Sequence, residues 1–269
     1  MVRDMTSLRK LSLVTALAVA SLAAAATPSM AIVGGHNTAN GAYPSVAEIT
    51  FGDAFLCSGT LIAPNWVLTA GHCGSITGDA VATPAAWPAP LINVRIGNDL
   101  IDQGGEVVPV SRAVVEPSYL ATSGYDITLL QLSRNSIKAP TKVSGTGDTA
   151  LWAPGTSEKI VGWGATREGG NLPNHLQEAN VPITTDSYCA GAYSDFDATT
   201  MICAGFPQGG TDTCQGDSGG PMFGAGNLVV GSTSFGEGCA RPNKPGVYAR
   251  DGDTALREWI RSQAPAGVN

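Results

Sequence analysis

The residues with the clearest chemical potential surround one serine. Residues 212–221 read DTCQGDSGGP, so Ser218 lies among three glycines. Glycine permits tight turns and lets a substrate backbone approach a side chain closely. A serine hydroxyl is a weak nucleophile and needs an adjacent base. Covalent chemistry at Ser218 therefore requires a histidine elsewhere in the chain.

Three histidines are available as that base. His72 follows the apolar run of CSGTLIAPNWVLTAGHC and lies beside Cys73. His36 and His175 lie in the polar stretches GGHNTANG and GGNLPNH, which are typical of a surface. The sequence therefore favours His72 as the base.

The base needs a buried carboxylate that sets its tautomer. Asp126 precedes the apolar run ITLLQL, although an aspartate at a strand start is usually a turn former. The order His72, Asp126, Ser218 is one of the known orders of a Ser-His-Asp triad. No histidine follows Ser218, which excludes the α/β-hydrolase order, and the subtilisin order would have to use Asp4 or Asp53.

Composition indicates the kind of fold that must position these residues. The chain of 269 residues contains 34 Gly and 17 Pro, and only 14% of its residues are charged. Frequent turn residues favour short strands and an all-β class over long helices. The formal net charge of −7 argues against a nucleic-acid partner and against docking to an anionic membrane.

Short apolar and β-branched segments recur between turn residues, a spacing typical of an antiparallel sandwich or barrel. The loop-like residues 140–156 are the best candidate boundary between two halves. Near the C-terminus, Leu256, Trp259 and Ile260 share one face of a predicted helix. The predicted strands are Ser45–Phe51, Ser58–Ile62, Trp66–Ala70, Leu91–Ile96, Glu106–Val115, Ile127–Leu132, Lys159–Trp163, Asn227–Thr233 and Gly246–Ala249.

The first 31 residues have the pattern of a secretory signal. Basic residues precede an apolar run over residues 11–26, and small residues follow at Ser29 and Ala31. The run is short for a membrane span, although an uncleaved anchor or a buried helix is the alternative. We therefore expect a secreted, extracellular protein that is not held at a membrane once residues 1–31 are removed.

The six cysteines fit an exported protein. An even number in an oxidising compartment indicates disulfides, but six cysteines allow 15 pairings. No C-x-x-C or H-E-x-x-H spacing occurs, which disfavours a metal site.

Several segments together resemble the trypsin-type serine proteases of the chymotrypsin fold, and they run across nearly the whole chain after residue 31. The resemblance implies two antiparallel six-stranded β-barrels, residues 32–145 and 146–269, with the C-terminal helix in the second and the active site between them. The matching segments are IVGG (32–35), TAGHC (69–73), DITLL (126–130), GWG (162–164), CAG (203–205), GDSGGP (216–221) and PGVYAR (245–250).

The same resemblance assigns roles at the active site. It makes His72, Asp126 and Ser218 the catalytic residues, and it builds an oxyanion hole from the amides of Gly216 and Ser218. Ser234 is expected to hydrogen-bond Asp126 and to help hold the substrate backbone. Gly71 departs slightly from the family, in which alanine is commoner at this position.

Substrate selection is expected to depend on Asp212, six residues before the serine. In the family this position is the floor of the primary specificity pocket, and aspartate there implies cleavage after Arg or Lys. Gly236 and Gly246 match wall positions that leave room for a long side chain. Phe235 replaces the usual tryptophan but keeps an aromatic wall. A chymotrypsin-like preference for aromatic residues is the alternative.

Activation is implied by the IVGG segment. Cleavage before Ile32 frees an ammonium group, which is expected to pair with Asp217. The bond to be cut follows Ala31 rather than Arg or Lys, so self-activation should be inefficient. Signal peptidase either cuts after Ala26, leaving a five-residue pro-segment and a zymogen, or cuts directly after Ala31.

The resemblance also bears on cross-links and ligands. It pairs Cys57 with Cys73, Cys189 with Cys203 and Cys214 with Cys239. No cofactor or catalytic metal is expected, although some relatives bind calcium in a loop near Asp99–Glu106. The carboxylate spacing in that loop of this chain is not diagnostic.

The expected partners are proteins or peptides that contain Arg or Lys, and protein protease inhibitors, with no nucleic acid and a monomeric enzyme. A catalytically inactive binding homologue and a secreted esterase of the same fold are the rival functions. All three triad residues are present, which disfavours the inactive homologue.

Overall fold

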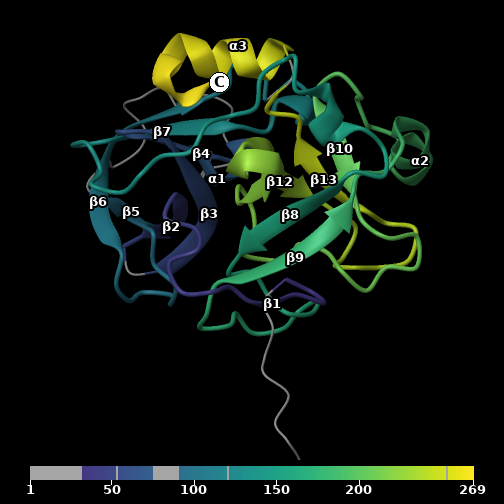
Figure 1. The fold of residues 1–269 in the computed structure, drawn as a ribbon, viewed down its shortest axis with the longest axis horizontal. Helices are drawn as coiled ribbons and strands as arrows, with labels where there is room; N and C mark the ends of the chain where they lie inside the picture. Colours follow the sequence, from purple (N-terminus) through teal and green to yellow (C-terminus); the bar gives the residue numbers. More distant parts are fainter. Residues whose placement is uncertain (1–31, 53, 75–90, 120, 253) are drawn as a thin grey trace, which may run out of the picture.

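The first half of the chain forms a closed barrel of six antiparallel strands, on the left of Figure 1. The computed structural model describes residues 32–269 except Asp53, residues 75–90, Leu120 and Asp253, so the expected signal segment lies outside the described residues. The strand order is β2-β3-β4-β7-β6-β5. The strands are β2 (Val46–Phe51), β3 (Ala54–Ala63), β4 (Trp66–Thr69), β5 (Ile92–Ile96), β6 (Glu106–Val115) and β7 (Thr128–Leu132).

The second half forms a seven-stranded antiparallel sheet of order β1-β9-β8-β11-β12-β13-β10. Ile183, directly after β9, bridges to Ala204 of β10, and the Thr184 amide donates to the Cys203 carbonyl at 2.9 Å. The six longer strands therefore curl until their two edges meet. The strands are β1 (His36–Asn37), β8 (Ser157–Gly162), β9 (Gln177–Pro182), β10 (Met201–Ala204), β11 (Pro221–Phe223), β12 (Val229–Phe235) and β13 (Gly246–Ala249).

Both ends of the described chain join the two halves. β1 precedes the closed barrel in sequence but pairs with β9 of the second sheet. At the other end, Leu256 and Ile260 of α3 (Thr254–Gln263) pack in one core with Ile62 and Val143. Figure 1 accordingly shows α3, in yellow, lying across the top of the closed barrel. The boundary after residue 145 remains a prediction.

The remaining helices are short and follow or precede strands. They are α1 (Gly71–Gly74), α2 (Asp186–Ala192), and the 3-10 turns η2 (Ser123–Tyr125), η3 (Thr149–Trp152), η4 (Ala225–Asn227) and η5 (Pro265–Gly267). Of these, α1 carries His72 and η2 ends directly before Asp126.

The all-β class and the C-terminal helix are confirmed. The second sheet has one strand more than expected, because the two-residue β1 adds to the edge of β9. Pattern alone missed β1, β9, β10 and β11. β9 reads QEANVP, and its inward-facing Gln177 is polar although fully buried, so only Ala179 and Val181 are left to mark the strand by apolar alternation.

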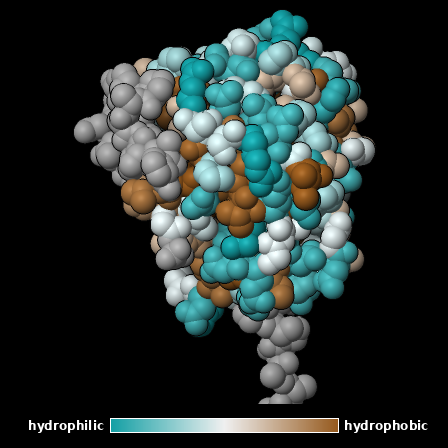
Figure 2. All heavy atoms as spheres, turned by 90° about the vertical axis from the view of Figure 1, so that its left-hand side faces the viewer, coloured by the Kyte–Doolittle hydropathy of each residue, from teal (hydrophilic) through white to brown (hydrophobic). Residues whose placement is uncertain are grey.

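The closed-barrel side of the surface is mainly hydrophilic, with apolar residues gathered near its middle (Figure 2). Among the described residues, Phe51, Leu91 and Val107 are large apolar side chains that remain exposed on or beside β2, β5 and β6. Within the same described part, no helix combines the length and apolarity that a membrane crossing requires.

Candidate active site

Strand pairing brings the predicted base and carboxylate together. In the β4–β7 pair, Thr69 lies opposite Thr128, so His72 just after β4 and Asp126 just before β7 emerge at the same end. His72 Nδ1 lies 2.9 Å from Asp126 Oδ2, and the His72 amide donates to Asp126 Oδ1 at 2.8 Å. The disulfide of Cys73 to β3 further fixes the turn that carries His72.

The environment of this pair makes the imidazole more basic. The side chain of Asp126 is 7% exposed and that of His72 is 36% exposed. Ser234 Oγ donates a short hydrogen bond to Asp126 Oδ2. Burial lowers the pKa of His72, but the hydrogen bond and charge of Asp126 outweigh burial, so the pKa of His72 is raised. The imidazole is therefore suited to accept a proton.

Gly71, the small departure from the family pattern, has a steric explanation. A Cβ at Gly71 would lie 2.9 Å from Asp126 Oδ1 and 2.9 Å from the Tyr119 ring. Tyr119 also lines a cavity beside His72 and Asp126. Glycine thus lets a tyrosine pack against the His72–Asp126 pair, a contact that sequence reasoning missed because nothing in the local pattern links Tyr119 to Gly71.

Ser218 is held against the closed barrel by its backbone. The Ser58 amide of β3 donates to the Ser218 carbonyl at 2.9 Å, and Cys73 Sγ lies 3.8 Å from the same oxygen. Gly219 has φ 74°, and a Cβ there would lie 2.0 Å from Thr69 Oγ1, so only glycine fits this approach. Among the described contacts, the Ser218 hydroxyl is not hydrogen-bonded to His72.

Two backbone amides beside the serine are free to bind a ligand. The amides of Asp217, Gly219 and Gly220 all donate to carbonyl oxygens. In the described part of the chain, no acceptor is recorded for the amides of Gly216 and Ser218. Gly216 has φ 102°, a conformation that L side chains rarely adopt. The loop therefore presents two unused N–H donors next to a hydroxyl.

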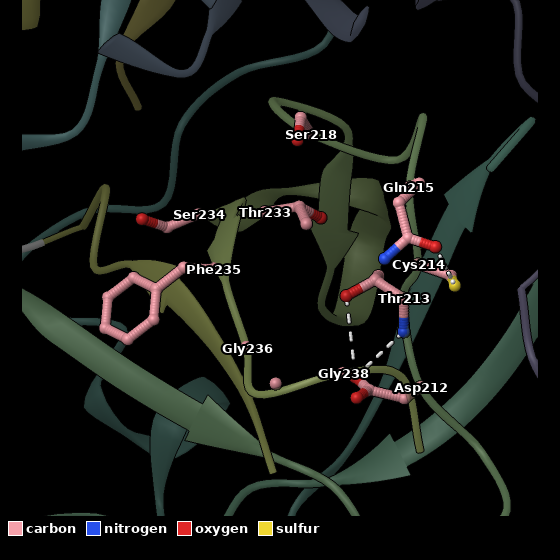
Figure 3. Close-up of a pocket in the computed structure, with 11 residues that line it drawn as sticks. Asp212, Thr213, Cys214, Gln215, Ser218, Thr233, Ser234, Phe235, Gly236 and Gly238 are labelled. Atoms are coloured by element: carbon pink, nitrogen blue, oxygen red, sulfur yellow. Dashed lines mark hydrogen bonds between the residues drawn. The ribbon is translucent and has the colours of Figure 1, made fainter. Parts of the chain in front are cut away.

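A cavity of about 180 Å³ runs from Ser218 to Asp212. Figure 3 shows the two side chains at opposite ends of it. Asp212 is 3% exposed, and its oxygens accept from the amides of Thr213 at 2.8 Å and Ala240 at 3.1 Å. Burial raises the pKa of Asp212 to about 7 despite these donors. Its carboxylate has no cation partner among the described residues, so the cavity favours a positively charged occupant.

The walls of the cavity include the predicted wall residues. Gly236, Gly246 and Phe235 all line it. A Cβ at Gly246 would lie 2.4 Å from Asp212 Oδ1, so a larger residue there would cover the carboxylate. The Phe235 ring packs edge-on against Tyr193 at 5.5 Å between centroids. Tyr193 therefore supports the aromatic wall, a role that its position in the sequence did not reveal.

A cluster of ion pairs stabilises the outer wall of the Asp212 cavity. Arg241 donates to both carboxylate oxygens of Glu168, at 2.9 and 2.6 Å. Lys244 Nζ lies 2.5 Å from Glu237 and 5.2 Å from the Tyr193 ring centroid. The cluster joins segments 73 residues apart, so local sequence patterns could not predict it.

The two residues predicted for activation are both buried in the second half. Ile32 is fully buried in the core of the second sheet, at φ 54°, where a β-branched residue is strained. Asp217 is also fully buried, and it accepts from the amides of Gly164 at 2.7 Å and Cys214 at 2.9 Å. Burial raises its pKa to about 7.

The other predicted features are placed as follows. The three disulfides join the cysteines that the resemblance pairs. His36 is exposed and lies 3.3 Å from Glu178, while His175 Nδ1 lies 2.9 Å from the carbonyl of Leu176, so neither is near Ser218 among the described contacts.

The loop considered for calcium offers few free ligands. Asp99 accepts from the Gly41 amide, and Glu106 is engaged by Arg134, Ser136 and the Ile137 amide. Among the described residues, the one grouping of three close His, Cys, Asp or Glu ligands includes Cys57 and Cys73, which form a disulfide. These residues do not fit a calcium site, and no step below uses calcium.

Comparison with known proteins agrees with this geometry. The family model described as Trypsin matches residues 32–260. A trypsin of Saccharopolyspora erythraea is 45% identical over 240 residues, which cover 88% of this chain and 100% of that protein. Trypsin 5G1 of Aedes aegypti is 34% identical over 242 residues, which cover 86% of this chain and 84% of that protein. The chain therefore belongs to the trypsin family of serine proteases.

Proposed function

We propose that this protease is a secreted endopeptidase that cleaves peptide bonds after Arg or Lys through an acyl-enzyme on Ser218. The observation that carries the proposal is the cavity that joins Ser218 to a buried, cation-free carboxylate, Asp212. A substrate side chain that neutralises Asp212 brings its own carbonyl carbon to the Ser218 hydroxyl.

The chemistry follows from the three side chains. His72 Nε2 takes the proton of Ser218 as Oγ attacks the carbonyl carbon, and then gives that proton to the leaving amine. A water molecule, deprotonated by His72, cleaves the resulting ester and restores the Ser218 hydroxyl. Asp126, 2.9 Å from Nδ1, keeps Nε2 free as the base and stabilises the imidazolium. The missing hydrogen bond between Ser218 and His72 is expected to form when substrate binds.

The oxyanion is expected to bind the two unused amides of Gly216 and Ser218. Each such donor typically stabilises the transition state by about 2.7–4 kcal/mol. Ser234 positions Asp126 through its hydroxyl and sits at the edge of the cavity, where substrate backbone would pass.

Specificity is expected to follow from the cost of burying an unpaired charge. An Arg or Lys side chain gives Asp212 an ion pair inside the cavity, whereas an aromatic side chain leaves the carboxylate without a partner. The chymotrypsin-like alternative lacks the ion pair that would offset the cost of burying Asp212.

Activation and export complete the proposal. Cleavage before Ile32 frees an ammonium group that pairs with Asp217, whose carboxylate faces no cation among the described residues. The enzyme is exported by residues 1–31 and acts as a monomer that protein inhibitors can block at the Asp212 cavity. N-terminal sequencing of the secreted Ser218→Ala protein distinguishes a zymogen, beginning at Thr27, from direct activation, beginning at Ile32.

Kinetics on matched amide substrates test the specificity. We expect Arg and Lys amides to be cleaved far better than Phe or Leu amides, and Asp212→Ser to remove that advantage. Equal rates on all four, or an unchanged ranking in Asp212→Ser, would reject trypsin-like specificity. Absence of labelling by an organophosphonate would favour the inactive binding homologue, and turnover of esters without amides would favour the esterase.

A further inference from the structure

A second cavity in the molecule also ends in a buried carboxylate. It encloses about 350 Å³ and is lined by residues 156–159, which include Glu158 and Lys159 of β8, by Leu151 and Asn180, and by residues 223–227. Glu158 is 3% exposed, the same fraction as Asp212. Neither the triad nor the Asp212 cavity includes any of these residues.

Strand geometry directs Glu158 inward. Side chains alternate along β8, and Glu158 lies on the same face as Ile160, which packs in the core of the second sheet. A Cβ at Gly224 would lie 3.2 Å from Glu158 Oε2, so the absence of a side chain there leaves the carboxylate open to the cavity.

Glu158 has no partner of its own. Its Oε1 is buried without a hydrogen bond, and no donor to either oxygen is recorded among the described residues. Burial raises the pKa of Glu158 to about 7, and no hydrogen bond or cation offsets the burial. A buried carboxyl group left without a partner is costly whether charged or protonated.

Lys159, the cation on the cavity wall, interacts with other residues. Lys159 lies on the opposite face of β8, where its Nζ lies 3.2 Å from Glu178 and 5.8 Å from the Tyr43 ring centroid. Leu151 and Phe223 add apolar surface to the wall, and Asn180 adds an amide. These surroundings fit a cationic head on an apolar stem better than a bare metal ion, because Glu158 is the one carboxylate among the described lining residues.

We propose that this cavity is a second binding site, in which Glu158 takes the guanidinium or ammonium head of an organic cation such as an Arg or Lys side chain. The site binds its ligand without chemistry, because its lining residues include the hydroxyls of Thr156 and Ser157 but no histidine that could act as their base. It is independent of the proposed protease specificity.

The test uses ¹⁵N-labelled Ser218→Ala protein, which prevents self-digestion, and the probe n-butylguanidinium, with n-butylurea as its neutral analogue of similar shape. Saturating amide shifts at Gly224 and Ala225 report the Glu158 cavity, and shifts at Thr213 and Gly236 report the Asp212 cavity. We expect a dissociation constant of about 1 mM at Gly224 and Ala225 for the cation, and at least tenfold weaker binding of the urea.

Glu158→Gln is expected to weaken the shifts at Gly224 and Ala225 at least tenfold while leaving those at Thr213 and Gly236 unchanged. Asp212→Ser should weaken the shifts at Thr213 and Gly236 while leaving those at Gly224 and Ala225 unchanged. The two sites can therefore fail independently in this experiment. In the unsubstituted cavity, binding should strengthen about tenfold from pH 6 to pH 8 as Glu158 ionises. Equal binding of the urea, or unaltered shifts in Glu158→Gln, would overturn the proposal; the urea comparison needs no substitution at Glu158.

Discussion

Asp212 and Glu158 lie in two cavities of the same half of the molecule, with equal exposure and similarly raised pKa values. They differ in what surrounds them. Asp212 accepts two backbone amides, and its cavity opens at Ser218. Glu158 accepts none among the described residues, and no histidine lines its cavity to activate a hydroxyl. We therefore expect either carboxylate to favour a cationic ligand, and we expect catalysis only where that ligand also reaches Ser218.

The largest expected difference between the cavities is in turnover. Ser218→Ala should lower kcat by about six orders of magnitude, the loss seen in subtilisin when its serine is removed. The substitution should leave n-butylguanidinium affinity unchanged in both cavities, because neither carboxylate is altered. Steady-state kinetics and NMR titration measure the two effects. Residual amide turnover within tenfold of the unsubstituted enzyme would place the nucleophile elsewhere.

Substrate selection should separate the two carboxylates next. Asp212→Ser should reduce kcat/KM for an Arg amide on the order of 10³-fold, or ~4 kcal/mol, because the substrate cation loses its buried partner. Glu158→Gln is the matched control, and it should change kcat/KM less than about twofold. A comparable loss in both variants would contradict the division of roles between the cavities.

In stability, by contrast, the two carboxylates should behave alike. Their folded pKa values of about 7 lie above the unfolded values, so between about pH 4 and 7 the folded state holds a proton that the unfolded state has lost. The free energy of unfolding therefore falls as pH rises through this range. Asp212→Asn and Glu158→Gln should each flatten the fall by up to about 1.4 kcal/mol per pH unit.

Urea unfolding at several pH values measures this slope. Asp99→Asn is the control, because this half-buried carboxylate lines neither cavity. An unchanged slope in Glu158→Gln would mean that Glu158 is ionised in the folded protein and already has a partner.

The smallest expected effect is that of the ion pair beside the outer wall of the Asp212 cavity, which has no counterpart in the Glu158 cavity. Glu168→Gln removes the charge that Arg241 binds through two hydrogen bonds beside Gly238, a residue of the cavity wall. We expect KM for an Arg amide to rise about two- to fivefold with little change in kcat, since exposed ion pairs contribute little. Salt should produce the same rise in the unsubstituted enzyme. A KM that changes neither in Glu168→Gln nor with added salt would show that the wall keeps its shape without the Arg241–Glu168 ion pair.

Local sequence anticipated much of the candidate site. Ser218 in its glycine-rich turn, His72 after an apolar run and Asp126 before one were each marked by their neighbours in the chain. Contacts between distant segments were not anticipated. Tyr119 against Gly71 and Arg241 on Glu168 depend on how strands and loops meet in space. β9 was not predicted for a similar reason, because its buried Gln177 donates to Asn37 of β1, 140 residues away in the sequence.

The sequence by itself determined the family, the all-β class, the order of the three candidate triad residues and the identity of the acid six residues before the serine. It did so because tight turns, strand patterns and nucleophile loops are local and need specific residues at fixed spacing. The tertiary structure decided which carboxyl groups are buried away from solvent. Asp212 and Glu158 look like ordinary carboxylates in the sequence. Only the packing of distant strands around them buries each carboxyl group without a cation partner among the described residues.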